Sequence, residues 1–455
     1  MRASQTAFMK HKTIPNIYKS GFISKIKKIR QESDSKKKDL SPTILDFGGL
    51  TFKLSRHFGF CFGVENAIDI AYRAINNNQS RRVFLLSEMI HNPEVNEDLL
   101  SRGVKFLMKT NGERLVDFKQ LTPDDLVIVP AFGTTIEIQN ELKALGIDPY
   151  QTDATCPFVQ KVWKRTSELG DKGYSVIIHG KKTHEETRAT FSHSIQKSKS
   201  LVILNIDDAY FLADFILGNN SVDQFWDRFN GCTSDGFDPK IDLERLGVVN
   251  QTTMLATETW KISEIIKEAF TKKYGTENLK DHFADTRDTL CYATNENQNS
   301  TNALINSGFD IAIVVGGFNS SNTTHLVELC ENISPTYFIR NSNSIISLNE
   351  IHSFDIHKKE LVIAKEWAKN LTLGSRIAIT SGASCPDILV EEVIEKIVNL
   401  SISERIIYNT DNEPLEINKL NLSTAKHDGS KEKPLQFDYL SQKVLKGLKE
   451  DYLNS

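Results

Sequence analysis

The residues of this sequence best suited to do chemistry are three cysteines, each of which comes directly before a helical pattern. Cys61 precedes GVENAIDIAYRA, whose apolar residues recur at a spacing of three and four. Cys156 precedes PFVQKVWKRTSEL, and Cys291 precedes YATNENQNSTNALINSG. A helix N-terminus favours a thiolate, which binds soft metals and acts as a nucleophile. Taken singly, a cysteine among apolar residues is more often an inert core residue.

A strand-like apolar run follows each helical pattern, about 20 residues after the thiol: VFLL (83–86), YSVIIHG (174–180) and IAIVVGG (311–317). Each unit has a second such run that ends in small or hydroxylic residues: VIVPAFGTT (127–135), LGVVNQTT (246–253) and RIAITSGAS (376–384). Apolar runs that alternate with helices are typical of parallel sheets covered by helices, with ligand sites beyond the carboxyl ends of the strands. Three thiols in register are hard to explain by packing alone. The repeat predicts an α/β fold of three pseudo-symmetric domains with mostly parallel sheets around a shared centre.

The repeat also suggests the domain boundaries. We predict an N-terminal extension (1–50), three α/β domains (51–154, 155–288 with an insertion near 200–245, and 289–400) and a C-terminal tail (401–455). Residues 1–40 are basic, and IPNIYKSGFISKI within them is apolar enough to pack on the body of the protein. The tail combines a polar linker with a final helical pattern, QFDYLSQKVLKGLKEDYL.

The bulk composition excludes several classes of protein. The chain has 455 residues, 39% of them hydrophobic and 25% charged, with a formal net charge of −4, which argues against a general nucleic-acid binder. It contains no apolar run long enough to span a membrane and no secretory leader, so we expect a cytoplasmic, reducing location. The alternative is a plastid-type organelle, with residues 1–40 as a transit peptide. The six cysteines contain no C-x-x-C pair, so buried thiols or a metal site are expected rather than a disulfide framework.

Three thiolates without a fourth partner suit few metal centres. Structural zinc usually has four protein ligands, and catalytic zinc more often uses histidine. A four-iron cluster held by three cysteines leaves one iron open to a substrate oxygen. This favours the cluster, although the spacing alone leaves zinc open. Of the other cysteines, Cys232 and Cys330 are interpreted as structural, and Cys385 in SGASCPD is a weaker candidate.

Polar loops near the expected helix starts indicate an anionic ligand. They carry imidazole, hydroxyl, amide and carboxyl groups: His91, His184, Glu186, Thr252, Thr253, Ser320, Ser321, Asn322 and Ser384. Such groups can hold a phosphate or diphosphate without a Walker motif. Each loop alone is better explained as a turn or an N-cap, and Glu186 beside Glu185 as a surface carboxylate. Their recurrence beside the expected strand ends favours a site.

Taken together, these motifs resemble the 4-hydroxy-3-methylbut-2-enyl diphosphate reductases of the non-mevalonate isoprenoid pathway, in their long plastid-like form. The resemblance covers about residues 50–400 in order: GFCFGVENAI, SEMIHNPEVNEDL, DATCPFVQKV, THEETRAT, NQTT, CYAT, NSSN and SGASCPD. It implies a trefoil of three domains around a central 4Fe–4S cluster held by Cys61, Cys156 and Cys291. It implies Glu186 as proton donor, working through Thr252. It also implies a set of substrate contacts: His91, His184, Thr252, Thr253, Ser320, Ser321, Asn322 and Ser384.

The sequence departs from the family pattern at Phe132, where many relatives have histidine, so one diphosphate contact is in doubt. No G-x-G-x-x-G follows an expected strand, so the family's ferredoxin- or flavodoxin-like electron donor is the expected partner, with no nucleic acid and no membrane.

Two rival functions stay open. One is a zinc hydrolase that uses His91, His184 and cysteines, and the other is a phosphate-binding regulatory module whose thiols are structural.

Overall fold

The computed structural model describes residues 14–47, 50–284, 289–372, 374–403, 420–424 and 435–437. It divides into two compact units. The first comprises Phe62–Thr294, and the second comprises Ile14–Cys61 together with the described residues from Asn295 onward. Within the described ranges, none of the helices combines the length and apolar character that crossing a membrane requires.

The first unit begins with a small parallel sheet in the strand order β4-β3-β5. One face is covered by a core to which helix α4 contributes Leu142. The elements run in the order α2 (Phe62–Asn77), β3 (Val83–Leu85), α3 (Pro93–Ser101), β4 (Lys105–Phe106), η3 (Phe118–Gln120), β5 (Leu126–Ile128) and α4 (Ile136–Ala144).

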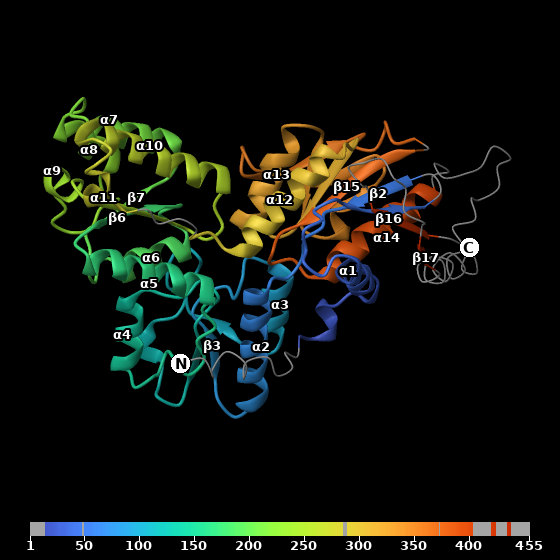
Figure 1. Cartoon of the computed structure of the whole chain (residues 1–455). Coiled ribbons are helices and arrows are strands. Elements are labelled where there is room, and N and C mark those ends of the chain that lie inside the picture. Colours follow the sequence, from blue (N-terminus) through green and yellow to red (C-terminus); the bar gives the residue numbers. More distant parts are fainter. Residues whose placement is uncertain are drawn as a thin grey trace. The chain divides into compact units, whose positions relative to one another are not determined.

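The same unit contains a second parallel sheet, in the order β7-β6-β8-β9. Its elements are α5 (Pro157–Asp171), β6 (Ser175–His179), α6 (Glu185–Ser194), β7 (Ser200–Ile203), α7 (Ile206–Ile216), α8 (Val222–Phe229), α9 (Pro239–Asp242), β8 (Leu246–Asn250), α10 (Ala256–Tyr274), α11 (Leu279–His282) and β9 (Phe283–Ala284). Helices α7, α8 and α10 pack on one face, and α5 and α6 on the other (Figure 1). Both faces are covered, so β6 and β8 are buried at every residue. Residues 200–245, expected to be an insertion, contribute β7 and helices α7, α8 and α9 to this layer.

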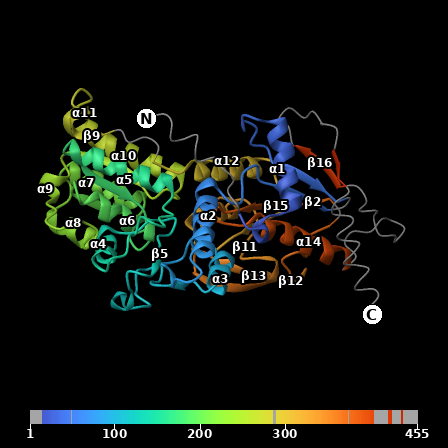
Figure 2. The ribbon, with the colours of Figure 1, turned by 90° about the horizontal axis from the view of Figure 1, so that it is seen from below.

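The second unit is built on a seven-stranded sheet, in the order β11-β10-β15-β2-β1-β16-β17. Figure 2 shows β2 beside β15, to which it is paired in parallel. The elements are η2 (Asn16–Tyr18), α1 (Gly21–Ser33), β1 (Thr43–Asp46), β2 (Leu50–Leu54), α12 (Tyr292–Asn306, beginning in the first unit), β10 (Ile311–Val315), α13 (Ser321–Glu331), β11 (Thr336–Ile339), η4 (Ser342–Ser344), β12 (Ile345–Ser347), β13 (Glu350–Asp355), β14 (Glu360–Lys365), β15 (Ser375–Ser381), α14 (Asp387–Ser403), β16 (Leu420–Thr424) and β17 (Leu435–Phe437). Strands β12, β13 and β14 form a separate antiparallel sheet.

The three sheets that contain parallel strands share one strand order, which corresponds to the repeat in the sequence. In each, the first strand after the cysteine helix is central, the second lies at one side and the third at the other: β4-β3-β5, β7-β6-β8 and β11-β10-β15. The position beyond the third strand is taken by the segment that leads to the next cysteine. It is β2 before Cys61, the bridge of Asp153 to Val129 before Cys156, and β9 before Cys291. The chain therefore passes from one sheet to the next at each cysteine. The predicted class, α/β with mostly parallel sheets, is confirmed, whereas the predicted domain boundaries remain a prediction.

The N-terminal helix α1 is part of the second unit's core. Phe22, Ile23 and Ile26 are at most 2% exposed, and they pack with strands β2, β10 and β15 and helix α14. Ser20 caps the helix by accepting a hydrogen bond from the Ile23 N–H. The predicted packing of this segment on the body of the protein is confirmed.

After α14, which ends at Ser403, the described parts of the C-terminal tail are strands. β16 pairs with β1 and β17 pairs with β16, both antiparallel, so they extend the sheet at its β1 side. Gln436 and Phe437, which open the predicted final helix, lie in β17. The rest of that predicted helix lies outside the described residues.

Candidate active site

The three cysteines predicted to bind a metal share one backbone environment. Cys156 is the N-cap of α5, and Cys61 and Cys291 immediately precede α2 and α12. The backbone N–H of each donates to a carbonyl oxygen in the loop beyond a third strand: Cys156 to Ala131 at 2.9 Å, Cys291 to Thr252 at 3.1 Å and Cys61 to Ala383 at 3.2 Å. The repeat in the sequence therefore corresponds to a repeated contact, which fixes each thiol between a helix start and a strand end.

The chemistry of these residues fits a soft metal centre, because all are thiols at helix starts. Cys61 and Cys156 are partly exposed, and Cys291 is 8% exposed. Within the described ranges no group of three or more His, Cys, Asp and Glu side chains is arranged to hold a metal ion. Cys61 belongs to a different unit from Cys156 and Cys291.

The remaining cysteines lie in apolar surroundings. Cys330 and Cys385 are fully buried, and Cys232 packs against the core of the second sheet. Burial raises the pKa of Cys330 to about 12 and also raises the pKa of Cys232. Burial therefore disfavours the thiolate form at Cys330 and Cys232.

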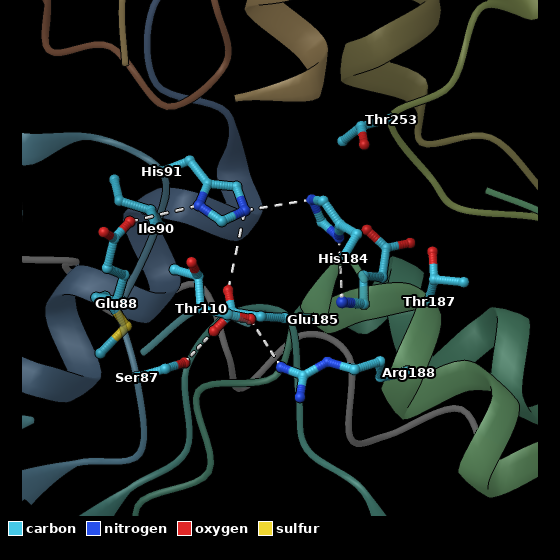
Figure 3. A network of polar contacts seen from close by, with 12 residues as sticks. Ser87, Glu88, Ile90, His91, Thr110, His184, Glu185, Thr187, Arg188 and Thr253 are labelled. Atoms are coloured by element: carbon cyan, nitrogen blue, oxygen red, sulfur yellow. Dashed lines mark hydrogen bonds and ion pairs between the residues drawn. The ribbon is translucent and has the colours of Figure 1, made fainter. Parts of the chain in front are cut away.

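A pair of histidines forms the centre of a polar network in the first unit (Figure 3). His184 is the N-cap of α6, and its Nε2 lies 3.2 Å from Nε2 of His91, just before α3. Phe132 stacks on the His91 ring at 4.2 Å between centroids and meets the His184 ring edge-on. The phenyl ring at the position of the departure therefore occupies one side of the imidazole pair.

The hydrogen bonds assign the tautomers of this pair. The Glu186 backbone N–H donates to Nδ1 of His184, so a neutral His184 carries its proton on Nε2 and donates to Nε2 of His91. His91 then carries its proton on Nδ1, which lies 3.4 Å from a Glu88 carboxylate oxygen. Burial lowers the pKa of His184 well below its usual value, in agreement with a neutral ring.

Glu185 lies beside the histidines and is 6% exposed. Its Oε1 accepts a short hydrogen bond from the Ser87 hydroxyl, and its Oε2 lies 3.9 Å from Nε2 of His91 (Figure 3). Burial raises the pKa of Glu185 to about 7, although His91 and Ser87 act in the opposite direction. This carboxyl group therefore changes charge near neutral pH, next to the imidazole pair.

Glu186 is held by Thr252 and is 1% exposed, so it is not a surface carboxylate. The Thr252 backbone N–H donates to Oε1 at 2.5 Å, and the Thr252 hydroxyl lies 3.0 Å from Oε2. Burial raises the pKa of Glu186 to about 7 against the effect of these two contacts. Because the Thr252 carbonyl also accepts from the Cys291 N–H, one residue connects the carboxyl group to a cysteine backbone.

In the second unit, the start of α13 carries donors that face the loop beyond β15. Ser320 is the N-cap and accepts from the backbone N–H and hydroxyl of Thr323, which leaves its own O–H able to donate to a ligand. Asn322 accepts through Oδ1 from the Ala383 N–H and from Asn297 Nδ2. Those contacts fix its amide, and its buried Nδ2 has no hydrogen-bond partner among the described residues. An unsatisfied buried donor of this kind indicates an acceptor ligand.

Ser321 and Ser384 belong to the same two segments, at 3% and 9% exposure. Gly382 permits the close approach of these segments, because a Cβ there would lie 2.0 Å from the Thr323 hydroxyl oxygen. Thr253, in the first unit, accepts from Gln251 Nε2.

Sequence reasoning missed Ser87, Glu185 and Gly382 as parts of the site. Two adjacent glutamates at a helix start give no sign of their burial, and Ser87 lies 98 residues from its partner. The small residues of SGAS were the one available signal for the close approach at Gly382.

Comparison with known proteins identifies the family. The family model described as LytB protein matches residues 52–398. A 4-hydroxy-3-methylbut-2-enyl diphosphate reductase from a strain of Prochlorococcus marinus is 39% identical over 84% of this chain and 95% of that protein. One from a Synechococcus strain is 41% identical over 79% of this chain and 88% of that protein.

A solved structure of E-1-hydroxy-2-methyl-but-2-enyl-4-diphosphate reductase from Plasmodium falciparum covers 78% of this chain with a TM-score of 0.55. It is 22% identical over 88% of its own length, and it shows that the two proteins share a fold. The resemblance carried by the eight sequence motifs is therefore confirmed, and the chain belongs to the LytB family of 4-hydroxy-3-methylbut-2-enyl diphosphate reductases.

Proposed function

We propose that this protein reductively dehydroxylates (E)-4-hydroxy-3-methylbut-2-enyl diphosphate, the last step of the non-mevalonate isoprenoid pathway. The products are isopentenyl diphosphate and dimethylallyl diphosphate. The observation that carries the proposal is the position of Thr252, which contacts the Glu186 carboxyl group through its N–H and hydroxyl and the Cys291 N–H through its carbonyl. The Glu186 carboxyl group is thereby linked through Thr252 to the backbone of Cys291, a proposed metal ligand.

Cys61, Cys156 and Cys291 are the proposed ligands of a 4Fe–4S cluster. The repeated backbone contact and the thiol state of all three support this assignment. Bound there, the cluster would supply electrons and an open iron for the allylic hydroxyl. At each cysteine, the backbone hydrogen bond fixes the residue between a helix start and a strand end.

The diphosphate is the proposed partner of the donors in both units. In the first unit they are His91, His184, Thr252 and Thr253, and in the second they are Ser320, Ser321, Asn322 and Ser384. The unpartnered Nδ2 of Asn322 and the free donor capacity of Ser320 support this assignment in the second unit. In the first unit, the proton on His184 Nε2 can be shared between His91 and a phosphate oxygen.

Glu186 is the proposed general acid. Removing the hydroxyl consumes protons as well as electrons: one proton leaves with the oxygen as water, and another adds to carbon at either end of the allylic system. Burial raises the pKa of Glu186 to about 7, so the group can both hold and release a proton near neutral pH. The Thr252 hydroxyl lies within hydrogen-bond distance and can pass that proton on.

A ferredoxin- or flavodoxin-like protein is the proposed electron donor, because the sequence offers no dinucleotide-binding fingerprint after a strand. The location is proposed as cytoplasmic. Packing of α1 in the core of the second unit favours this over removal of residues 1–40 as a transit peptide.

Anaerobic purification followed by turnover tests the proposal. We expect a brown protein with iron and acid-labile sulfide that converts the allylic diphosphate when given an artificial reductant. Glu186→Gln should keep the iron and lose about 100-fold or more in turnover, the usual contribution of a general acid. Glu168→Gln, on the exposed side of α5, is the matched control and should leave turnover unchanged. Zinc in place of iron, or iron without turnover of the substrate, would contradict the proposal.

A further inference from the structure

The loop that leads to Cys61 is contacted by residues of the N-terminal segment. This segment lies outside the eight family motifs. Lys27 on α1 donates through Nζ to the Phe58 carbonyl oxygen at 2.9 Å. The same ammonium group lies 4.6 Å from the centroid of the Phe58 ring. Phe58 is three residues before Cys61, so a side chain of α1 fixes both the backbone and the ring of the segment that carries the thiol.

Lys27 also connects this loop to the start of α14. Its Nζ contacts both carboxylate oxygens of Asp387, at 2.7 and 2.9 Å (Figure 1 shows α1 beside α14). Gly59 lies against the pair with φ of +79°, and a Cβ there would be 2.1 Å from an Asp387 oxygen and 2.9 Å from Lys27 Nζ. The positive φ favours glycine here, and a side chain at this position would displace the ion pair.

A second contact comes from Tyr18 in η2. Its ring, on a residue that is 5% exposed, meets the Phe60 ring edge-on at 5.8 Å between centroids. Phe60 directly precedes Cys61. The same loop also contacts the end of β15, because the Gly59 N–H donates to the Ser381 hydroxyl and the Cys61 N–H donates to the Ala383 carbonyl. The loop therefore contacts both the N-terminal segment and the end of strand β15.

We propose that Lys27 and Tyr18 are positioning residues that hold the Cys61 thiol in place for the metal centre. The N-terminal segment would then contribute to the site. The inference rests on the proposed function in one respect, that Cys61 binds a cluster. Residues that orient metal ligands through a second layer of contacts typically change metal affinity by about 10- to 100-fold when they are replaced.

The first test uses the metal-free full-length protein and is independent of the cluster. Cys61 and Cys156 are alkylated with iodoacetamide, and the two rates are compared by mass spectrometry in the same molecule. Lys27→Met should change the rate at Cys61 severalfold and leave Cys156 unaffected. Lys28→Met on the exposed side of the same helix, where the lysine side chain is 76% exposed, is the matched control and should change neither. Equal Cys61 rates in the two variants would overturn the proposal.

The second test uses the cluster-loaded protein. Lys27→Met should lose iron to a chelator at least about tenfold faster than Lys28→Met, and its reduction potential should shift. Tyr18→Ala, which leaves the ion pair intact, should act in the same direction.

Should Lys27→Met fail to fold in a thermal melt, Asp387→Asn keeps the side-chain volume and should give the same Cys61-selective effect. Wild-type protein without iron would refute the proposed function, while the alkylation comparison would still decide the role of Lys27.

Discussion

The Thr252 N–H and hydroxyl lie on different oxygens of the Glu186 carboxyl group, at 2.5 Å from Oε1 and 3.0 Å from Oε2. The backbone N–H can only donate, so Oε1 is an obligatory acceptor. The hydroxyl can donate or accept, so Oε2 is the oxygen that can carry the acid proton. When Glu186 is protonated, its O–H donates to Thr252, whose own O–H then points to another acceptor. The geometry therefore allows a proton to move between Glu186 and the Thr252 hydroxyl.

Replacing the Thr252 side chain tests this relay. Thr252→Val keeps the volume and the backbone N–H and removes the hydroxyl, so we expect turnover to fall by about 100-fold, as for a lost acid–base group. Thr252→Ser retains the hydroxyl and should stay within about tenfold of wild type, a loss worth about 1.4 kcal/mol in the barrier. Single-turnover rates at saturating substrate measure the effect. Equal losses in the valine and serine variants would show that the hydroxyl has no part in proton transfer.

The pH dependence of turnover follows from the carboxyl group's burial. Burial raises the pKa of Glu186 from 4.5 to about 7, so the folded protein holds this proton below about pH 7 and loses it above. A general acid must be protonated to act, so turnover should be high in mildly acidic solution and should fall as the pH rises through about 7.

The same shift affects stability with a definite sign. The folded state binds this proton more tightly than the unfolded chain, so its contribution to the free energy of unfolding declines as the pH rises from 4.5 to about 7. Profiles of turnover and of urea unfolding between pH 5 and pH 9 measure both effects. In Glu186→Gln the alkaline fall in residual turnover should disappear, and its persistence would assign that fall to another group such as Glu185.

The sequence contains the local parts of this site but few of the contacts between them. Cys61, Cys156 and Cys291 could be placed at helix starts because a helical period and a buried strand follow each one. The pairing of β2 with β15 could not be predicted, because it joins segments more than 300 residues apart through backbone atoms. Lys27 and Asp387, 360 residues apart, are also an unremarkable lysine and aspartate until the fold brings them together. Helical periodicity depends on neighbours along the chain. The environment of Glu185 also depends on Ser87, which follows strand β3.

Two functions of His184 can be separated by substitution. Its Nδ1 caps α6 by accepting the Glu186 N–H, and its Nε2 proton is the one available to His91 or to a phosphate oxygen. His184→Ala removes both functions, so we expect the free energy of unfolding to fall by about 1 kcal/mol, the usual effect of a lost N-cap. His184→Asn retains a capping oxygen and should restore most of that stability. Both variants should raise KM for the diphosphate about tenfold through the lost charge-assisted hydrogen bond.

Urea unfolding and steady-state kinetics measure these effects on His184 separately. A His184→Asn variant with wild-type KM would show that Nε2 makes no contact with the substrate. A His184→Ala variant as stable as wild type would show that the cap contributes nothing to α6.

Gly382 tests the construction of the second unit's donors. A Cβ at this position would lie 2.0 Å from the Thr323 hydroxyl oxygen and 3.1 Å from its Cβ, so Gly382→Ala must push the strand-end loop away from α13. We expect the free energy of unfolding to fall by about 1–3 kcal/mol, as for overpacking of a tight interior. KM should rise as well, because Asn322 is held through its contact with the Ala383 N–H in that loop.

Thr323→Ala removes the hydroxyl that a Cβ at position 382 would meet. The double variant should therefore be more stable than the sum of the single changes predicts. A double-mutant cycle by urea unfolding measures this coupling, and strict additivity would show that the close approach of Gly382 to Thr323 places no constraint on the loop.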